Sequence, residues 1–154
     1  MPRGHFILKD HESRPLVMAA AGIGLTPILS MIDFIASSAN DNPNQVVICL
    51  QVEQSPEEHS VKEHIDNLAG KKLLTQTHVF YTRHSGEGVT LQNTTVHTGR
   101  PSTKALQSIV GNVLHEAEFY FCGPEGFMDG FHAMLDDLEV DKSRRHSERF
   151  GPEL

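Results

Sequence analysis

The chain has 154 residues, and its 13 basic and 20 acidic residues give a formal net charge of -7 at pH 7 with histidine neutral. This acidic balance argues against a nucleic-acid-binding surface and against binding to anionic lipid, because both need a basic face. The length suits one domain, which by size scaling buries roughly 70% of the surface of its unfolded chain without disulfides or metals. An anionic ligand would have to be held locally, against the overall field.

The cysteine and histidine content does not indicate a metal centre. Cys49 and Cys122 are too few for a four-thiolate site or a disulfide framework, and they indicate a reducing compartment. The ten histidines are scattered, and no H-x-x-x-H pair occurs among them. Residues 1–4 begin no signal peptide, and no apolar run is long enough to span a bilayer. We therefore expect a cytoplasmic protein with no metal site and no membrane partner.

The first half of the chain opens on an apolar strand and a glycine turn. Residues 4–8 predict a short strand, and residues 16–20 predict a buried strand that ends just before Gly22 and Gly24. In the segment that follows, Thr26 suits a helix N-cap and Pro27 suits the first helical position, with the helix running on to Ile35.

The glycine turn has two interpretations. Several N–H groups and the positive end of a helix dipole converge there, which suits a phosphate or pyrophosphate. Pro27, however, stands where the dinucleotide fingerprint G-x-G-x-x-G has its third glycine. A phosphate site and a turn without a ligand therefore stay equally open from this stretch alone.

A regular alternation of strands and helices follows. Residues 45–50 predict a second buried strand, residues 56–70 a helix, and residues 73–82 a third strand. Alternation of this kind is typical of parallel strands. The polar segment Gln51 to Gln54 then falls at the edge where an α/β sheet meets its ligand.

The second half begins with a polar stretch, residues 84–100, that predicts a surface loop with a short hairpin. A helix capped by Ser102 follows and ends near Gly111, and residues 118–122 then form an aromatic strand. A Gly-Pro break leads from this strand into a helix over residues 125–138, and residues 146–152 predict a last edge strand. Three residues of this half have ordinary structural interpretations, as a small buried thiol, a solvated acid and a packing anchor respectively: Cys122, Glu148 and Phe150.

Four segments in this order resemble the nicotinamide-binding domain of the ferredoxin-NADP reductase superfamily: G-H-F-I-L, A-A-G-I-G-L-T-P-I-L-S-M, F-Y-F-C-G-P-E-G-F-M and E-R-F-G-P. Within that superfamily the chain most resembles the C-terminal domain of flavohemoproteins, the nitric oxide dioxygenases. The resemblance implies a three-layer α/β/α fold with a five-stranded parallel sheet in the order 3-2-1-4-5. It also implies that residues 1–12 are a remnant of the last flavin-domain strand with a linker, and that residues 13–154 are the NAD(P)-binding domain.

The resemblance also assigns roles to residues. The pyrophosphate loop would comprise Gly22, Ile23, Gly24, Leu25, Thr26 and Pro27. The adenosine ribose would lie beside the segments 51–54 and 81–83, with Gln51, Glu53 and Arg83 as binding residues. The nicotinamide ring would lie beside Cys122, Gly123 and Pro124, with Phe127 and Met128 behind it. Phe150 would cover the flavin, Glu148 would tune the redox centres, and Cys122 and Glu148 would be the catalytic residues.

The chain departs from the family in its missing parts. It has no R-x-Y-S flavin signature, no flavin-binding barrel and no globin domain, and Arg149 stands where flavohemoproteins often have cysteine. We therefore expect an NAD(P)H-dependent flavin oxidoreductase domain that needs FAD held mainly by another domain. Hydride would pass from nicotinamide to FAD, and electrons onward to haem or another acceptor. The expected partners are a flavin-binding domain or protein, a globin or iron-sulfur acceptor, and a second copy of the chain through the apolar flavin-facing surface.

Two alternatives to this function remain: a nucleotide-sensing or interaction module without catalysis, and a fold that binds no ligand. The choice of coenzyme also stays open. Glu53 favours NADH, because a carboxylate there accepts hydrogen bonds from the ribose hydroxyls, whereas Arg83 favours NADPH.

Overall fold

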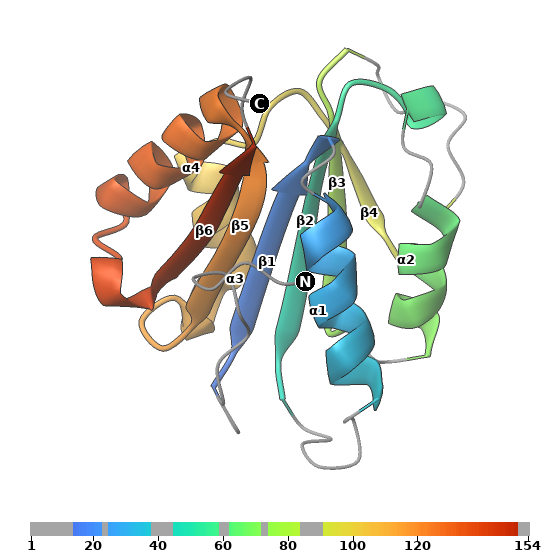
Figure 1. Cartoon of the computed structure of the whole chain (residues 1–154), viewed down its shortest axis with the longest axis horizontal. Helices are drawn as coiled ribbons and strands as arrows, with labels where there is room; N and C mark the ends of the chain where they lie inside the picture. Colours follow the sequence, from blue (N-terminus) through green and yellow to red (C-terminus); the bar gives the residue numbers. More distant parts are fainter. Residues whose placement is uncertain are drawn as a thin grey trace.

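Six parallel strands form one sheet, in the order β4-β3-β2-β1-β5-β6, in the computed structural model of the chain (Figure 1). The strands are β1 (Leu16–Ala21), β2 (Val47–Glu53), β3 (Gln76–Tyr81), β4 (Thr95–Thr98), β5 (Glu118–Pro124) and β6 (Arg145–Phe150). The structure describes residues 14–22, 25–37, 45–58, 62–71, 74–83 and 91–150.

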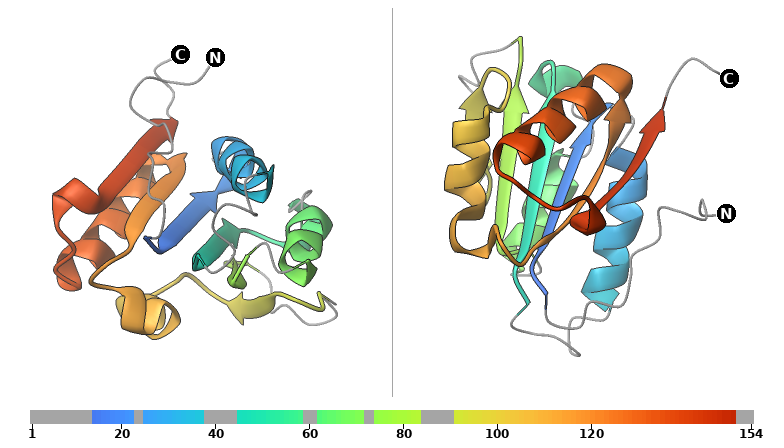
Figure 2. Two further views of the ribbon diagram at one scale, coloured as in Figure 1. Left: turned by 90° about the horizontal axis from the view of Figure 1, so that it is seen from below. Right: turned by 90° about the vertical axis from the view of Figure 1, so that its left-hand side faces the viewer.

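Helices cover both faces of the sheet (Figure 2). The helices α1 (Leu25–Ser37) and α2 (Lys62–Gly70) lie on one face, and α3 (Thr103–Val110) and α4 (Glu125–Asp137) lie on the other. The predicted α/β architecture with a parallel sheet between helix layers is therefore confirmed. The predicted N-cap of α3 is also confirmed, because the Ser102 hydroxyl accepts a hydrogen bond of 3.1 Å from the backbone N–H of Ala105.

Strand β1 is the centre of the sheet, with β2 on one side and β5 on the other. All six of its residues are buried. Alternate side chains point into the two cores: Leu16 and Met18 pack against α1 and α2, while Val17 and Ala19 pack on the side of α3 and α4. A strand buried on both faces needs apolar residues at every position, and the sequence L-V-M-A-A-A meets that need.

A buried polar group holds the amino ends of β5 and β6 together. The Glu118 carboxylate accepts hydrogen bonds from the guanidinium of Arg14 and from Nε2 of His146, the latter over 2.6 Å. The imidazole of His146 stacks on the ring of Tyr120, with 4.5 Å between the ring centroids. This cluster lies at the end of the sheet opposite the carboxyl ends of the strands.

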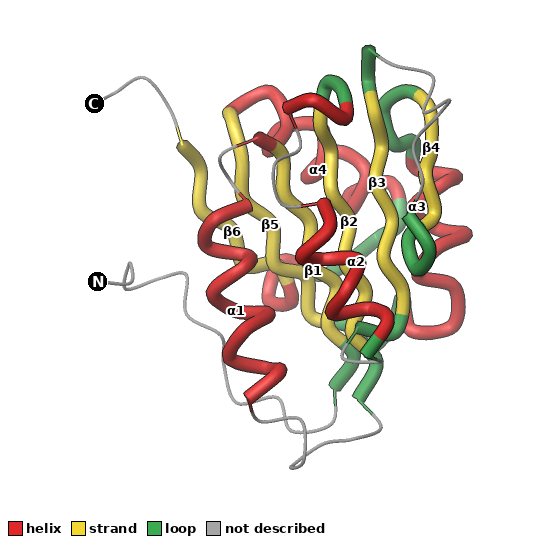
Figure 3. Tube along the Cα trace, turned by 90° about the vertical axis from the view of Figure 1, so that its right-hand side faces the viewer, coloured by secondary structure: helices red, strands yellow, loops and turns green. Residues whose placement is uncertain are grey.

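The predicted count of five strands is wrong, because part of the predicted loop over residues 84–100 forms β4. This strand pairs in parallel with β3 at the edge of the sheet (Figure 3). It has only four residues, T-V-H-T, and two of them are exposed. A short, half-polar edge strand lacks the apolar run that marks the buried strands, and the sheet order therefore extends by one strand beyond β3.

Two helix boundaries also differ from the prediction. Helix α1 begins at Leu25, so Thr26 lies inside its first turn and is not the N-cap. The predicted helix over residues 56–70 is divided into a 3₁₀ turn at Pro56–Glu58 and α2 from Lys62. The predicted strand at residues 4–8, and the boundary at residues 12 and 13, lie outside the described residues.

Two general properties of the described residues bear on the choice of function. None of their helices combines the length and the apolar character that a membrane crossing requires. Nor do they contain a cluster of three or more His, Cys, Asp or Glu side chains that could share a metal ion.

Candidate functional site

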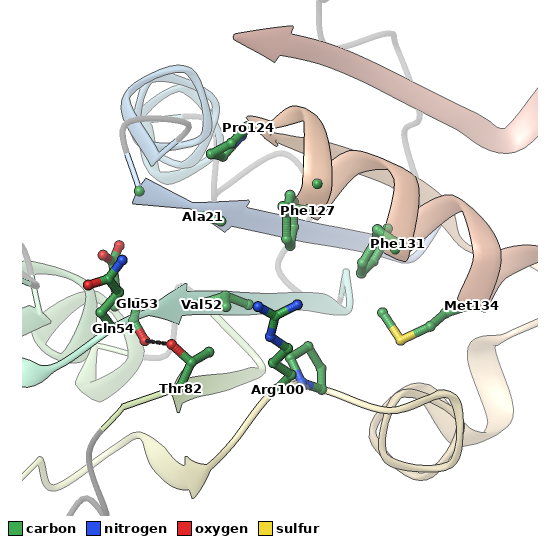
Figure 4. A pocket seen from close by; sticks show the side chains of 14 residues that line it. Ala21, Val52, Glu53, Gln54, Thr82, Arg100, Pro124, Phe127, Phe131 and Met134 are labelled. Atoms are coloured by element: carbon green, nitrogen blue, oxygen red, sulfur yellow. Dashed lines mark hydrogen bonds between the residues drawn. The ribbon is translucent and has the colours of Figure 1, made fainter. Parts of the chain in front are cut away.

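A cavity of about 430 Å³ opens at the carboxyl edge of the sheet (Figure 4). This volume falls within the range of roughly 300–1,000 Å³ that is typical of small-molecule sites. The cavity is lined by the ends of four strands, the segment before α3 and one side of α4: Ala21, Gly22, Val52, Glu53, Gln54, Thr82, Arg100, Pro101, Pro124, Gly126, Phe127, Gly130, Phe131 and Met134.

The cavity lies where the connectivity of the sheet reverses. The chain leaves β1 into α1 on one face of the sheet, and it leaves the neighbouring β5 into α4 on the other face. Because the two helices diverge, a crevice stays open between the strand ends. In open α/β sheets ligands bind at this place.

Gly22 forms the β1 side of the cavity. Its φ is +57°, in the left-handed region that favours glycine, and a Cβ built on it would meet no atom within 4 Å. The backbone is therefore open to a ligand at this point, and α1 begins three residues later. Of the rest of the predicted pyrophosphate loop, Ile23 and Gly24 lie outside the described residues, and Pro27 lies half-buried in the first turn of α1.

The ends of β2 and β3 form a polar wall that backbone hydrogen bonds hold in place. The N–H of Thr82 donates to the carbonyl of Glu53 over 2.8 Å, and the N–H of Arg83 donates to the carbonyl of Gln54 over 2.9 Å. Glu53, Gln54 and Thr82 line the cavity, whereas the side chain of Arg83 is exposed and does not. Gln51, a predicted binding residue, is buried on the α1 and α2 side of the sheet.

Carboxylates lie near the end of β3. Burial first, and then the neighbouring carboxylates of Glu53, Glu63 and Glu57, raise the pKa of Tyr81 to about 12. The one cationic side chain among the described residues that line the cavity is Arg100. The site thus combines a carboxylate at the strand ends with a guanidinium on the opposite side.

The wall that α4 contributes is aromatic and apolar. Phe127 and Phe131 lie one helical turn apart with their ring centroids 5.7 Å apart, and Met134 continues the same side of the helix. Gly126 and Gly130 add no side chain there, and a Cβ on either would meet no atom within 4 Å. Met128, predicted to pack with Phe127 behind the nicotinamide, lies in the core and is 1% exposed.

The end of β5 brings the predicted catalytic residues next to one another. Cys122 pairs with Glu148 in the register of β5 and β6, and Pro124 pairs with Phe150. Cys122 is fully buried, Gly123 is buried, and Pro124 lines the cavity. The side chains of Glu148 and Phe150 lie outside the described part of the structure, as do those of Leu25 and Thr26.

Sequence reasoning missed several residues of the site. On α4 the spacing of Gly126, Gly130 and Met134 is four residues, which places them on one side of a helix, so this signal was available once Phe127 had been assigned. Arg100 and Pro101 carry no such signal, because they come from the segment between an unrecognised edge strand and α3.

Comparisons with known proteins agree with this geometry. The family of oxidoreductase NAD-binding domains matches residues 18–133. The flavohemoprotein of Deinococcus radiodurans is 35% identical over 154 residues, and that of Bordetella pertussis is 34% identical over 153 residues. These matches cover 99% and 97% of the chain but 36% of each relative, so the chain spans about a third of their length.

A solved structure shows the same fold. The flavohem-like FAD/NAD binding domain of nitric oxide dioxygenase from Vibrio cholerae superimposes with a TM-score of 0.81 at 29% sequence identity, covering 98% of this chain and 56% of that one. The match to the family model spans the strand ends and the first nine residues of α4, and so includes all of the cavity lining but Met134. The chain belongs to the family of oxidoreductase NAD-binding domains.

Proposed function

We propose that this chain is the NAD(P)H-binding half of a flavin-dependent reductase, and that the cavity holds the adenosine half of the coenzyme. The observation that carries the proposal is the set of groups that meet at the carboxyl edge: the open Gly22 backbone, the Glu53 carboxylate, and an aromatic wall on α4. These groups suit a pyrophosphate, a ribose and a flat base in turn. This proposal assigns Phe127 to the adenine half of the coenzyme, whereas the resemblance placed it behind the nicotinamide. The nicotinamide would then extend along the end of β5 toward Cys122 and Pro124.

The chain's own part in the reaction would be to bind and orient. NAD(P)H supplies the hydride and FAD, held on another domain, accepts it and passes electrons on. Hydride transfer depends on close alignment of the reacting atoms, so a misplacement of about 1 Å costs on the order of a hundredfold in rate. The backbone at the end of β5, with Cys122 buried beneath it, and the register partners of Cys122 and Pro124 on β6, Glu148 and Phe150, would define where the two rings meet.

Titration calorimetry with NADH, NADPH and ADP-ribose tests the proposal directly. We expect the isolated chain to bind ADP-ribose and NADH but to reduce no acceptor by itself. Gly24→Val should weaken binding while circular dichroism shows an intact fold, because a pyrophosphate approaches the backbone there. Failure of a folded parent chain to bind ADP-ribose or NADH would refute the assignment.

A fusion behind a compatible flavin-binding barrel tests the catalytic part. The fusion should reduce ferricyanide with NADH, and Cys122→Ala in it should slow flavin reduction far more than it weakens NADH binding. Equal effects on the rate constant and on affinity would leave Cys122 as a packing residue. A chain that binds nucleotides, forms no complex with flavin domains in gel filtration and stays inactive in the fusion would instead be a nucleotide-binding module.

We infer a preference for NADH over NADPH from the same wall. Glu53 lies at the cavity, and its carboxylate opposes a 2′-phosphate there. Arg83, the residue that favours NADPH, is exposed outside the lining. NADH should therefore bind more tightly than NADPH, and Glu53→Gln should reduce the difference between their two dissociation constants. A parent chain that prefers NADPH would contradict the inference.

A further inference from the structure

Arg100 is held firmly in place by its neighbours in the chain. Gly99 adopts a φ of +89°, and its N–H donates to the carbonyl of Tyr81 over 2.9 Å, which fixes the backbone to the end of β3. On the other side, Ser102 caps α3. The backbone is thus fixed on both sides of Arg100, by the hydrogen bond of Gly99 before it and by the helix cap at Ser102 after it.

The side chain of Arg100 points into the cavity (Figure 4). Within the part of the chain that the structure describes, its guanidinium makes no hydrogen bond and no ion pair. A guanidinium carries five N–H donors on a planar, weakly hydrated group. An arginine whose backbone is fixed and whose head group enters a cavity without a protein partner is available to a ligand.

The surroundings of this guanidinium are largely apolar. Figure 4 shows it reaching toward Phe127, with Phe131 and Met134 to one side, while Glu53 and Gln54 lie on the other side of the cavity. A phosphate would be poorly placed against the two phenyl rings and the thioether. A flat heteroaromatic ring fits, because arginine stacks on aromatic faces and phenylalanine does the same from the opposite side.

We propose that Arg100 stacks its guanidinium on the adenine ring of the dinucleotide, with Phe127 on the opposite face of that ring. The proposal rests on the function proposed above, since it places the base within the same cavity. Arg100 then recognises the flat face of the adenine ring, which NADH and NADPH share, and so contributes little to the distinction between them.

The variant Arg100→Lys tests the proposal, because it removes the planar guanidinium and keeps the positive charge. Calorimetric titrations of Arg100→Lys with ADP-ribose, NADH and NADPH should each give a dissociation constant higher by on the order of tenfold, by the same factor for all three ligands. Phe127→Leu should weaken the same three ligands. Reduced nicotinamide mononucleotide, which lacks adenine, should bind Arg100→Lys as it binds the parent. Lys104→Gln, which removes an exposed cation from the first turn of α3, should bind all ligands like the parent.

The possible results separate the two proposals. If the parent binds ADP-ribose and Arg100→Lys binds it equally well, the stacking role is overturned while the nucleotide site stands. If Arg100→Lys keeps its affinity for NADPH and Arg100→Ala loses it selectively, Arg100 contacts the 2′-phosphate and the stacking role is again overturned. If the folded parent binds none of the three adenine ligands, the proposed function itself fails, and the role of Arg100 fails with it.

Discussion

Gly123 leaves the space that the ring of Phe127 occupies. A Cβ built on Gly123 would lie 2.7 Å from Cδ2 of Phe127 and 3.3 Å from both Cβ and the carbonyl oxygen of Ala21. This glycine, the second-last residue of β5, therefore fixes how closely the first turn of α4 approaches β1. Because Phe127 and Ala21 both line the cavity, the same glycine determines the width of the site.

Gly123→Ala should therefore destabilise the protein and disturb the cavity together. Overpacking of this kind costs about 1–3 kcal/mol in the free energy of unfolding. The Phe127 ring must move, so we also expect weaker binding of ADP-ribose. Urea denaturation and calorimetry measure the two effects. Gly126→Ala is the matched control for stability, because its Cβ would meet no atom within 4 Å and alanine favours a helix over glycine by up to about 1 kcal/mol. A Gly123→Ala protein as stable as the parent would contradict the contact.

The carboxylate of Asp66 on α2 fastens the segment that leads into β4. Its Oδ1 accepts hydrogen bonds from the N–H of Asn93 over 2.8 Å and from the hydroxyl of Thr94 over 2.7 Å, and Asp66 is 8% exposed. Asp66→Ala should lower the free energy of unfolding by about 2–3 kcal/mol, because these donors lose a charged acceptor. Asp66→Asn, which keeps one acceptor oxygen, should cost less.

An exposed carboxylate provides the control for Asp66. Asp137 accepts one hydrogen bond of 3.1 Å from the hydroxyl of Thr103, and both groups are at the surface. Asp137→Ala should change the free energy of unfolding by less than about 0.5 kcal/mol. Urea denaturation measures both variants. If Asp66→Ala and Asp137→Ala lower the free energy of unfolding by equally small amounts, the role given to Asp66 is wrong.

A histidine pair makes stability depend on pH. Nδ1 of His78 lies 2.9 Å from Nε2 of His97, and His97 stacks on Phe80 with 4.3 Å between the ring centroids. Burial first, and then the neighbouring His97, lower the pKa of His78 to about 4, and burial lowers that of His97.

Histidine in the unfolded chain titrates near pH 6.5, so the unfolded chain binds more protons than the folded chain below that pH. The stabilisation from these neutral rings should be complete above about pH 6.5 and should be lost as the pH falls toward 4. Urea denaturation between pH 7 and pH 4.5 measures the loss. His78→Gln should make the free energy of unfolding depend less on pH in this range, whereas the control His115→Gln, at an exposed position, should not. An unchanged curve for His78→Gln would show that another group causes the dependence.

Both thiols should resist modification in the folded protein. Cys49 and Cys122 are 0% exposed, and burial raises the pKa of Cys49 to about 12. The reactive thiolate of Cys49 is therefore scarce even at pH 8.5. Mass spectrometry after treatment with iodoacetamide should find label only after denaturant is added, and the Cys49→Ser variant assigns the sites. Rapid labelling of Cys49 in the native chain would contradict its burial.

The parts of the fold that the sequence predicts well are those with a strong local signal. The apolar run of β1, the aromatic run of β5 and the serine cap of α3 each depend on a few neighbouring residues. Strand β4 has no such run, and its place follows from pairing with β3 and from the hydrogen bonds to Asp66, which are contacts between distant residues.

The same distinction applies to the site. Gly22 and Phe127 lie in recognisable motifs, and both line the cavity. Met128 lies one position after Phe127, but the rotation of the helix turns it into the core, which a linear motif does not express. Arg100 enters the site only because β4 and α3 bring its segment to the ends of the other strands.

The place of β1 has a consequence for how the chain folds. Leu16 pairs with Val47 on one side, but its partner on the other side is Glu118, about a hundred residues later in the chain. Closing so large a loop is slow, because its entropy must be lost before the contacts form. Until β5 arrives, one edge of the most apolar strand has no neighbour, and an open apolar edge pairs readily with other chains. The growing chain is therefore most prone to aggregate after β4 has been synthesised and before β5 has. In the complete sheet β1 lies at the centre, and both of its edges are paired.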